Sequence, residues 1–187
     1  MIYLFLAEGF EEIEALGTLD VLRRAGVETK TVGVTGAVVT GSHGIPVTAD
    51  LVIEDAVKGQ DLDGVILPGG MPGTKNLEAS DLVKDFLQYS RDNSLLIAAI
   101  CAAPSVLGHL GYLEGKKATC FPGFETELRG AVYTADSVTE DGNIITGNTM
   151  PLKVPKAARG LATDVLRERY FLSKKHKKND TLLGCRF

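Results

Sequence analysis

The stretch 95–107 constrains the fold of this 187-residue chain more than any other. Leu95–Ile100 is a continuous apolar run of strand length, and Ala102–Leu107 is compatible with a helix that carries Pro104 in its first turn. Cys101 therefore lies at a predicted turn between a buried strand and a helix. A strand that is buried on both faces and leads directly into a helix is typical of an α/β protein with a parallel sheet.

The position of Cys101 has a chemical consequence. The first N–H groups of a helix have no partner within the helix and carry partial positive charge. A thiol there is expected to ionise easily, and the N–H of Ala102 is placed to bind an oxyanion. Free cysteine is also one of the residues most often buried in protein cores. The residues alone therefore leave two interpretations of Cys101 open, a nucleophile and a core thiol.

Strand-like and helix-like segments alternate along most of the chain. Strands are predicted at Ile2–Ala7, Val27–Val34, Gly64–Leu67, Ala118–Cys120 and Val132–Thr134, and helices over Glu11–Ala25, after the capping residue Ser80 and over Val154–Phe171. Hairpins are predicted around Ser42-His43-Gly44 and Asp141-Gly142-Asn143, and Leu51–Val57 is ambiguous. We predict one α/β domain over residues 1–171, with an active site beyond the carboxyl ends of its parallel strands.

Composition narrows the range of functions. Apolar residues make up 44% of the chain and charged residues 24%, as in a globular protein. The N-terminal apolar run is too short for a signal or membrane segment, so a cytoplasmic protein without a membrane partner is expected. The net charge is −4 although residues 172–187 form a basic tail, so the remaining body is acidic and a poor surface for nucleic acid.

The cysteine and histidine pattern supports neither a metal site nor a disulfide framework. Cys101, Cys120 and Cys185 are an odd number without a C-x-x-C pair, and the three histidines are far apart in the sequence. The chain also has no glycine motif that would cradle a phosphate. No cofactor is expected.

A nucleophilic cysteine needs a group that handles protons, and Glu8, Glu11, Glu12 and Glu14 follow the first predicted strand. A carboxyl in an apolar site beside a thiolate would have a raised pKa and would serve as acid and then as base. Spacing does not choose among the four, although Glu11 and Glu12 are accounted for as first-turn carboxylates that complement the helix dipole. The backbone of Gly69-Gly70 is a second candidate for binding an oxyanion.

Three motifs together resemble the DJ-1/ThiJ/PfpI superfamily, in the branch of the parkinsonism-associated protein and its bacterial relatives. They read L-A-E-G-F-E-E-I-E-A, V-I-L-P-G-G-M-P-G and I-A-A-I-C-A-A-P, and the similarity extends with compatible spacing from Met1 to about Gly147. The resemblance implies a homodimer of flavodoxin-like three-layer α/β sandwiches with a mainly parallel central sheet, a fold similar to that of the class I glutamine amidotransferases.

The resemblance also implies roles for individual residues. By motif position, Cys101 is the nucleophile, Glu14 is the proton shuttle, and the N–H groups of Gly70 and Ala102 bind the oxyanion. The residues expected to line the substrate site are Gly69, His43 and Phe121.

Several positions depart from the family pattern. Ala102 follows the cysteine where the protease-like branch has a histidine, which argues against a Cys-His peptidase. Phe121 stands where some relatives have a histidine, so Glu14 must carry the proton transfers. His43 stands where relatives often have an arginine, and it either lines the site or the dimer contact or is a surface histidine. Residues 148–155 read N-T-M-P-L-K-V-P in place of a Gly-Pro-Gly-like loop.

Two functions of different classes follow from the resemblance. The first is a cofactor-independent enzyme for small reactive aldehydes or glycated substrates, a glyoxalase III-like or protein deglycase-like hydro-lyase or hydrolase. It would turn a 2-oxoaldehyde into a 2-hydroxy acid through Cys101 and Glu14. The second is an oxidative-stress sensor or chaperone that works through oxidation of Cys101 to sulfinic acid.

Overall fold

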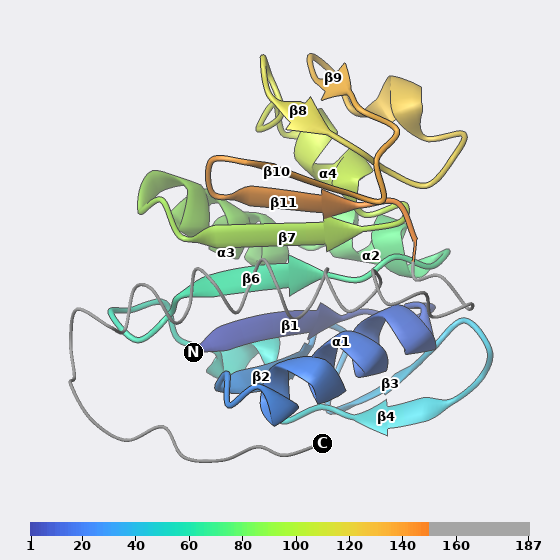
Figure 1. Cartoon of the computed structure of the whole chain (residues 1–187). Coiled ribbons are helices and arrows are strands. Elements are labelled where there is room, and N and C mark those ends of the chain that lie inside the picture. The colour runs from blue at the N-terminus through green and yellow to red at the C-terminus, as the bar shows by residue number, and fades with distance from the viewer. Residues whose placement is uncertain (150–187) are drawn as a thin grey trace.

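The computed structural model describes residues 1–149, which form an α/β domain around one seven-stranded sheet (Figure 1). The strands of this sheet are β1 (Ile2–Leu6), β2 (Thr29–Gly33), β5 (Leu51–Val52), β6 (Gly64–Leu67), β7 (Leu96–Ile100), β10 (Val138–Asp141) and β11 (Ile144–Gly147). Their order is β10-β11-β7-β6-β1-β2-β5. Every neighbouring pair is parallel except β10–β11, so the predicted α/β fold with a mainly parallel sheet is confirmed.

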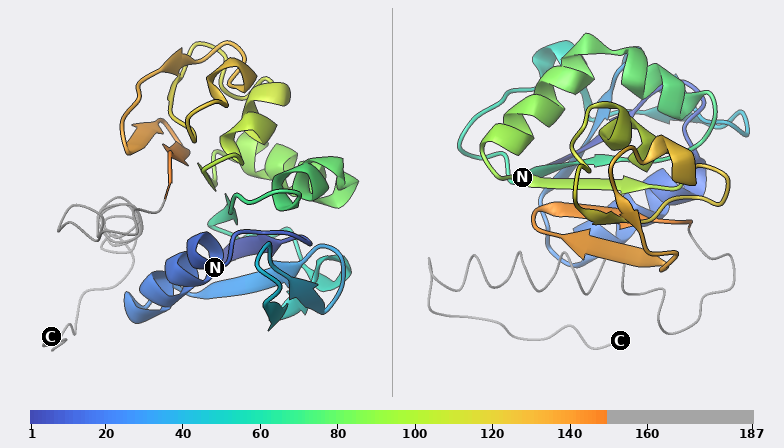
Figure 2. Two further views of the ribbon diagram at one scale, coloured as in Figure 1. Left: turned by 90° about the vertical axis from the view of Figure 1, so that its right-hand side faces the viewer. Right: turned by 90° about the horizontal axis from the view of Figure 1, so that it is seen from above.

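Helices cover both faces of the sheet, which gives three layers (Figure 2). The helix α1 (Glu12–Arg24) lies on one face, and the other face carries α2 (Gly73–Ala79), α3 (Asp81–Asp92) and α4 (Pro104–His109). Ser80 caps α3 as predicted, since its hydroxyl accepts a hydrogen bond from the N–H of Val83 at 3.3 Å. The helix α4 begins at Pro104, two residues later than the predicted start at Ala102, because residues 101–103 form a turn.

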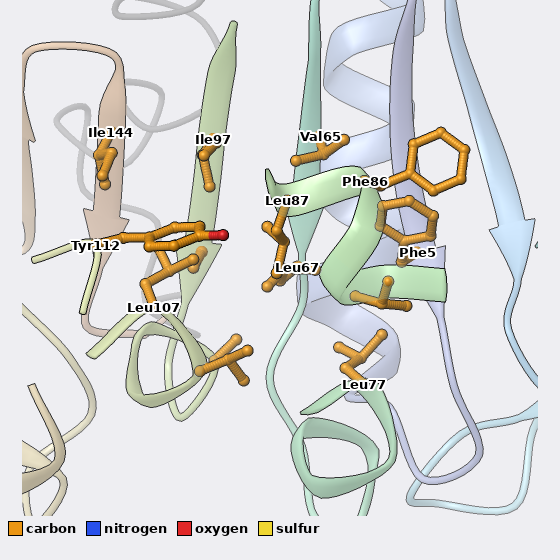
Figure 3. Close-up of a cluster of buried hydrophobic side chains, with 14 of the residues drawn as sticks. Phe5, Val65, Leu67, Leu77, Phe86, Leu87, Ile97, Leu107, Tyr112 and Ile144 are labelled. Atoms are coloured by element: carbon orange, nitrogen blue, oxygen red, sulfur yellow. The ribbon is translucent and has the colours of Figure 1, made fainter. Parts of the chain in front are cut away.

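Successive side chains of β1 enter two separate cores, as the two-residue period of a strand requires. Leu4 and Leu6 pack on the α1 side, whereas Tyr3 and Phe5 pack on the α3 side. There the ring centroids of Phe5 and Phe86 are 5.4 Å apart, and Figure 3 shows these rings within the same cluster. Because both faces of β1 are buried in close-packed cores, the end of the strand that leads to Glu14 is held rigidly in place.

Two small sheets flank the main one. The antiparallel pair β3 (Val38–Thr40) and β4 (Pro46–Thr48) is the first predicted hairpin, and β10 with β11 is the second. The short strands β8 (Lys117–Ala118) and β9 (Val132–Tyr133) pair in parallel. Two 3₁₀ turns, η1 (Ile53–Asp55) and η2 (Glu125–Glu127), complete the described elements.

The structure also differs from the sequence-based expectations. The helix α2 was not predicted from the sequence; it begins at Gly73 after the capping residue Pro72, and both residues are typical of turns. The ambiguous segment 51–57 divides into β5 and η1. The predicted helix over Val154–Phe171 and the tail 172–187 lie outside the described residues, so the domain boundary at residue 171 stays a prediction.

Among residues 1–149, no helix is both long enough and apolar enough to cross a bilayer.

Candidate active site

The sheet order brings three chain segments to one edge. The strands β1, β6 and β7 are neighbours and parallel, so their carboxyl ends lie side by side. From these ends come the loop 7–11 that leads to Glu14, the turn Pro68-Gly69-Gly70, and Cys101. This is the arrangement expected for the site of an open α/β sheet.

Cys101 occupies a strained elbow directly after β7. Its φ angle is 64°, a left-handed conformation that residues with a Cβ seldom adopt. Two backbone hydrogen bonds hold it there, one from the N–H of Cys101 to the carbonyl of Gly147 and one from the N–H of Phe121 to the carbonyl of Cys101, both 2.8 Å long. The elbow leaves the thiol half-buried at the edge of the sheet.

Glycines allow the loop after β1 and the turn after β6 to pack closely against each other. The N–H of Glu11 donates to the carbonyl of Gly69 at 2.9 Å, and the N–H of Gly73 donates to the carbonyl of Gly9 at 3.0 Å. Gly70 has a φ of +93°, and a Cβ there would lie 2.4 Å from the nitrogen of Glu11. The start of α1 is therefore fixed against the turn after β6.

Glu14 is the one glutamate of the four candidates that contacts Cys101. Its side chain is only 4% exposed and hydrogen-bonded to the thiol, and its Oε2 accepts a hydrogen bond of 2.9 Å from the N–H of Gly69. A Cβ built on Gly69 would lie 2.7 Å from that oxygen and 2.6 Å from the Cβ of Cys101. Position 69 therefore admits no side chain between the two groups.

Burial dominates the proton affinities of this pair. It raises the pKa of Glu14 to about 7, and the charge of Glu11 acts in the same direction against the hydrogen bonds from Cys101 and Gly69. Burial and the charge of Glu14 raise the pKa of Cys101 to about 12. Burial and the charge of Glu14 therefore oppose the easy ionisation of Cys101 that the helix terminus alone predicts.

The pair can nevertheless form a thiolate. Above about pH 7 the two groups share one proton, and its transfer along their hydrogen bond converts thiol and carboxylate into thiolate and carboxyl. The N–H groups of Gly70 and Ala102 both hydrogen-bond to the sulfur and favour the charged form. These are the two donors that the sequence predicts for an oxyanion, and both converge on Cys101.

The other three glutamates have structural partners. Glu11 caps α1 by accepting from the N–H of Glu14 at 2.7 Å, and Glu8 accepts from the N–H of Thr40 at 3.0 Å. Glu12 is buried, so its interpretation as a simple first-turn carboxylate is incomplete. Burial alone would raise the pKa of Glu12, but hydrogen bonds from His43 and Ser42 outweigh it and lower the pKa to about 2.

His43 lies on the surface and contacts Glu12. Its Nδ1 is 2.8 Å from Oε2 of Glu12, and its backbone N–H donates to Oε1 at 2.7 Å. The hydrogen bond to Glu12 raises the pKa of His43. Ligand atoms of Glu11, Glu12 and His43 lie within 4.8 Å of one another, as a metal site would require, but these atoms already serve the helix cap and the hairpin contact. A substrate-binding role for His43 stays a prediction.

Phe121 lies next to the elbow through its backbone bond to Cys101, and its ring is 42% exposed. Sequence reasoning did not identify Gly147, whose carbonyl fixes the N–H of Cys101. The only local signal for it is the β-branched run Ile144–Thr146, which predicts a strand but not its neighbour.

Comparisons with known proteins agree with this geometry. The model of the DJ-1/PfpI family matches residues 1–163. The chain belongs to the DJ-1/PfpI family. Protein dj-1beta of Drosophila melanogaster is 39% identical over 144 residues, which cover 75% of this chain and 76% of that protein. The Parkinson disease protein 7 homolog of Danio rerio is 38% identical over 145 residues, covering 75% and 77%.

Solved structures of DJ-1 proteins share the flavodoxin-like fold. The oxidized form of Toxoplasma gondii DJ-1 superposes with a TM-score of 0.81 at 32% identity, covering 94% of each chain. The structure of Drosophila melanogaster DJ-1beta gives a TM-score of 0.78 at 34% identity and covers 89% of this chain and 88% of that one. The three-layer architecture described above is thus that of the DJ-1 structures.

The raised pKa of Glu14 makes stability depend on pH. The folded state binds the proton of the Glu14 carboxyl more tightly than the unfolded state does. The protonated carboxyl therefore contributes fully to the unfolding free energy below pH 4.5, and this contribution is lost as the pH rises through about 7. We predict that the unfolding free energy of the wild type falls relative to that of Glu14→Gln by about 3 kcal/mol over this interval, at about 1.4 kcal/mol per pH unit. Urea unfolding followed by circular dichroism measures it. Glu28→Gln, which changes an exposed carboxyl, is the control, and parallel curves for wild type and Glu14→Gln would contradict the prediction.

The close contact at Gly69 gives a second prediction. Gly69→Ala should cost about 1–3 kcal/mol of unfolding free energy, because the new methyl group forces Cys101 and Glu14 apart. Gly59→Ala is the matched control, since nothing lies within 4 Å of a Cβ at that position. Thermal unfolding and the rate of Cys101 alkylation should both change in the first variant and stay as in wild type in the second. Equal behaviour of the two variants would refute the proposed crowding.

Proposed function

We propose that this DJ-1/PfpI family member is a cofactor-independent cysteine enzyme that converts small 2-oxoaldehydes into 2-hydroxy acids. The observation that carries the proposal is the direct hydrogen bond between the buried carboxyl of Glu14 and the thiol of Cys101, with two backbone N–H groups directed at the sulfur. Such a pair provides a nucleophile, a proton shuttle and an oxyanion site in one place. Release of aldehyde-derived adducts from amines or thiols would use the same chemistry.

The first step is addition of the thiol to the aldehyde. The Glu14 carboxylate takes the thiol proton, the sulfur forms a bond to the aldehyde carbon, and the carbonyl π bond becomes an oxyanion. The N–H groups of Gly70 and Ala102 stabilise that oxyanion, since both already face the sulfur. Return of the proton from Glu14 to the oxygen gives a neutral hemithioacetal.

The second step moves a proton between two carbons. Glu14 removes the proton from the former aldehyde carbon, which gives an enediolate, and the same carboxyl delivers that proton to the adjacent carbon. The hydroxyl proton on the former aldehyde carbon passes to the neighbouring oxygen, so the first carbon becomes a carbonyl and the second carries a hydroxyl. The product is a thioester of the 2-hydroxy acid on Cys101. Water then cleaves the carbon–sulfur bond and restores the thiol. A carboxyl with a pKa of about 7 is suited to both directions of transfer at neutral pH.

Turnover of methylglyoxal without glutathione tests this function. We expect the wild type to form lactate over many turnovers, while Cys101→Ser and Glu14→Gln lose at least about a hundredfold in rate, as is usual for general acid–base groups. Cys120→Ala is the matched control, because it removes the buried second thiol of the described residues and should retain activity. A wild type without turnover, or a Cys101→Ser variant that keeps it, would sink the proposal.

A second candidate is a sensor of peroxide. The thiolate and carboxyl form of the pair favours it, because a thiolate is the species that peroxide oxidises and the protonated Glu14 would donate a hydrogen bond to the resulting sulfinate. Two equivalents of peroxide are each reduced to water as sulfur gains two oxygen atoms. Intact-mass analysis after peroxide treatment separates this function from catalysis, since a sensor changes mass once and consumes no aldehyde.

We also propose that the protein is a homodimer, joined through the exposed side of α1 and the tip of the β3–β4 hairpin. Ile13 is 49% exposed and Ile45 is 50% exposed, and each lies beside one partner of the contact between Glu12 and His43. Figure 1 shows the hairpin beside α1. Exposed apolar side chains gathered in this way mark contact surfaces.

Light scattering coupled to size-exclusion chromatography tests the dimer. The wild type should have twice the chain mass, and Ile13→Asp should shift it to the monomer because a buried carboxylate there would lack a partner. Val57→Asp, at a residue 69% exposed in another part of the surface, should leave the dimer intact. A monomeric wild type would overturn the interface.

A further inference from the structure

His109 bridges two carboxylates outside the Cys101 site. Its Nδ1 lies 2.5 Å from Oε1 of Glu78, and its Nε2 lies 2.8 Å from Oε2 of Glu127. The three residues come from three different elements, since His109 ends α4, Glu78 belongs to α2 and Glu127 to η2. Figure 1 shows α4 between α2 and the upper part of the molecule that carries β8 and β9. We call these three residues the His109 clasp.

A continuous series of hydrogen bonds connects the clasp to the nucleophile. The N–H of Phe121 donates to the carbonyl of Cys101 at 2.8 Å, that of Phe124 donates to Phe121 at 3.1 Å, and that of Glu127 donates to Phe124 at 3.0 Å. The side chain of Glu127 then meets His109. The segment 121–128 is therefore a row of tight turns fixed at one end to the Cys101 elbow and at the other to the imidazole.

Packing allows little play between α4 and this segment. A Cβ on Gly108 would lie 2.1 Å from the carbonyl oxygen of Glu127 and 2.9 Å from the Cα of Leu128. Leu128 is itself buried in the core on the α3 side of the sheet. Packing therefore holds the C-terminal end of the segment beside α4, and the hydrogen bond from His109 adds to this contact at Glu127.

His109 donates hydrogen bonds to both carboxylates only when its imidazole is protonated. An imidazolium donates from both ring nitrogens, whereas neutral imidazole donates from one and presents a lone pair to the other carboxylate. The charged groups that face His109 are Glu78, Glu127 and Arg129. Burial lowers the pKa of His109, but the hydrogen bonds to Glu127 and Glu78 outweigh burial and raise it overall, so the bridged form extends toward neutral pH.

We propose that His109 is a positioning residue that, when protonated, holds the segment 121–128 against the Cys101 elbow and releases it on deprotonation. Phe121 would then move away from the site as the pH rises. The effect on catalysis rests on the proposed aldehyde chemistry, whereas the effect on the segment does not. The His109 clasp and the Cys101–Glu14 pair therefore respond to pH in opposite ways. The clasp loses its positive charge as the pH rises, whereas the pair gains one negative charge as the pH rises through about 7.

Three variants separate the clasp from other effects of pH. His109→Gln can place one N–H near the Nε2 position and so retains at most one of the two bonds. His109→Arg carries a permanent charge with several donors and keeps the bridge at every pH. Asp85→Asn is the matched control, because it removes the carboxylate of an unrelated contact, 2.6 Å from Lys58.

Amide hydrogen exchange of the peptide 121–128, corrected for intrinsic rates, is the direct readout. In the wild type we expect protection to fall about fivefold between pH 6 and pH 10, a range that extends well above the ordinary histidine pKa because the pKa of His109 is raised. Fivefold is the ratio typical of losing one charge-assisted bond in a half-buried pair. His109→Gln, which keeps at most one of the two bonds, should show at both pH values the lower protection of the deprotonated wild type. His109→Arg should be protected at both, and Asp85→Asn should behave like the wild type. Since the Cys101–Glu14 pair still titrates in His109→Arg, a constant protection there assigns the effect to His109.

Kinetics provide the second readout. With methylglyoxal at pH 6, His109→Gln should raise KM about fivefold with a smaller change in kcat, and His109→Arg should restore KM. Equal protection of His109→Gln and wild type at pH 6, or wild-type protection that does not change from pH 6 to pH 10, would overturn the clasp. An enzyme without aldehyde turnover would instead contradict the proposed function, because the exchange experiment contains no aldehyde.

Discussion

The buried hydrogen bond between Glu14 and Cys101 is the constraint on which the site depends. The carboxyl of Glu14 and the thiol of Cys101 can carry one negative charge between them. Burial and charge repulsion strongly oppose a second negative charge. Holding the two groups together requires that nothing larger than a hydrogen occupy position 69. The interlocked glycines of the loops after β1 and β6 satisfy this requirement, and the sheet order makes their meeting possible.

Much of this arrangement could be predicted from local patterns. The apolar runs at Ile2–Ala7, Gly64–Leu67 and Leu95–Ile100 predict strands because a central parallel strand is apolar on both faces. Three such strand ends were expected at one edge of the sheet, and the parallel register of β1, β6 and β7 confirms this. The elbow at Cys101 followed from the abrupt change of a strand into a helix.

Contacts between distant residues could not be predicted in this way. Position in the motif indicated Glu14, but spacing along α1 did not distinguish it from Glu11 and Glu12, since that choice depends on which carboxyl faces β6 and β7. The bridge at His109 joins residues far apart in sequence, and no pattern in the sequence of α4 predicts which residues His109 contacts. The factors that raise the pKa of Cys101 could not be predicted for the same reason, because the helix terminus is a local feature whereas burial and the charge of Glu14 come from the assembled fold.

The bond between the N–H of Cys101 and the carbonyl of Gly147 has a consequence for the order of assembly. The strained backbone of Cys101 is supported by β11, which is separated from it in the chain by α4, β8, η2, β9 and β10. A ribosome must therefore translate well past Cys101 before this bond can hold the cysteine in its left-handed conformation. A nascent chain that ends before β11 lacks this support, so the elbow is completed late in synthesis.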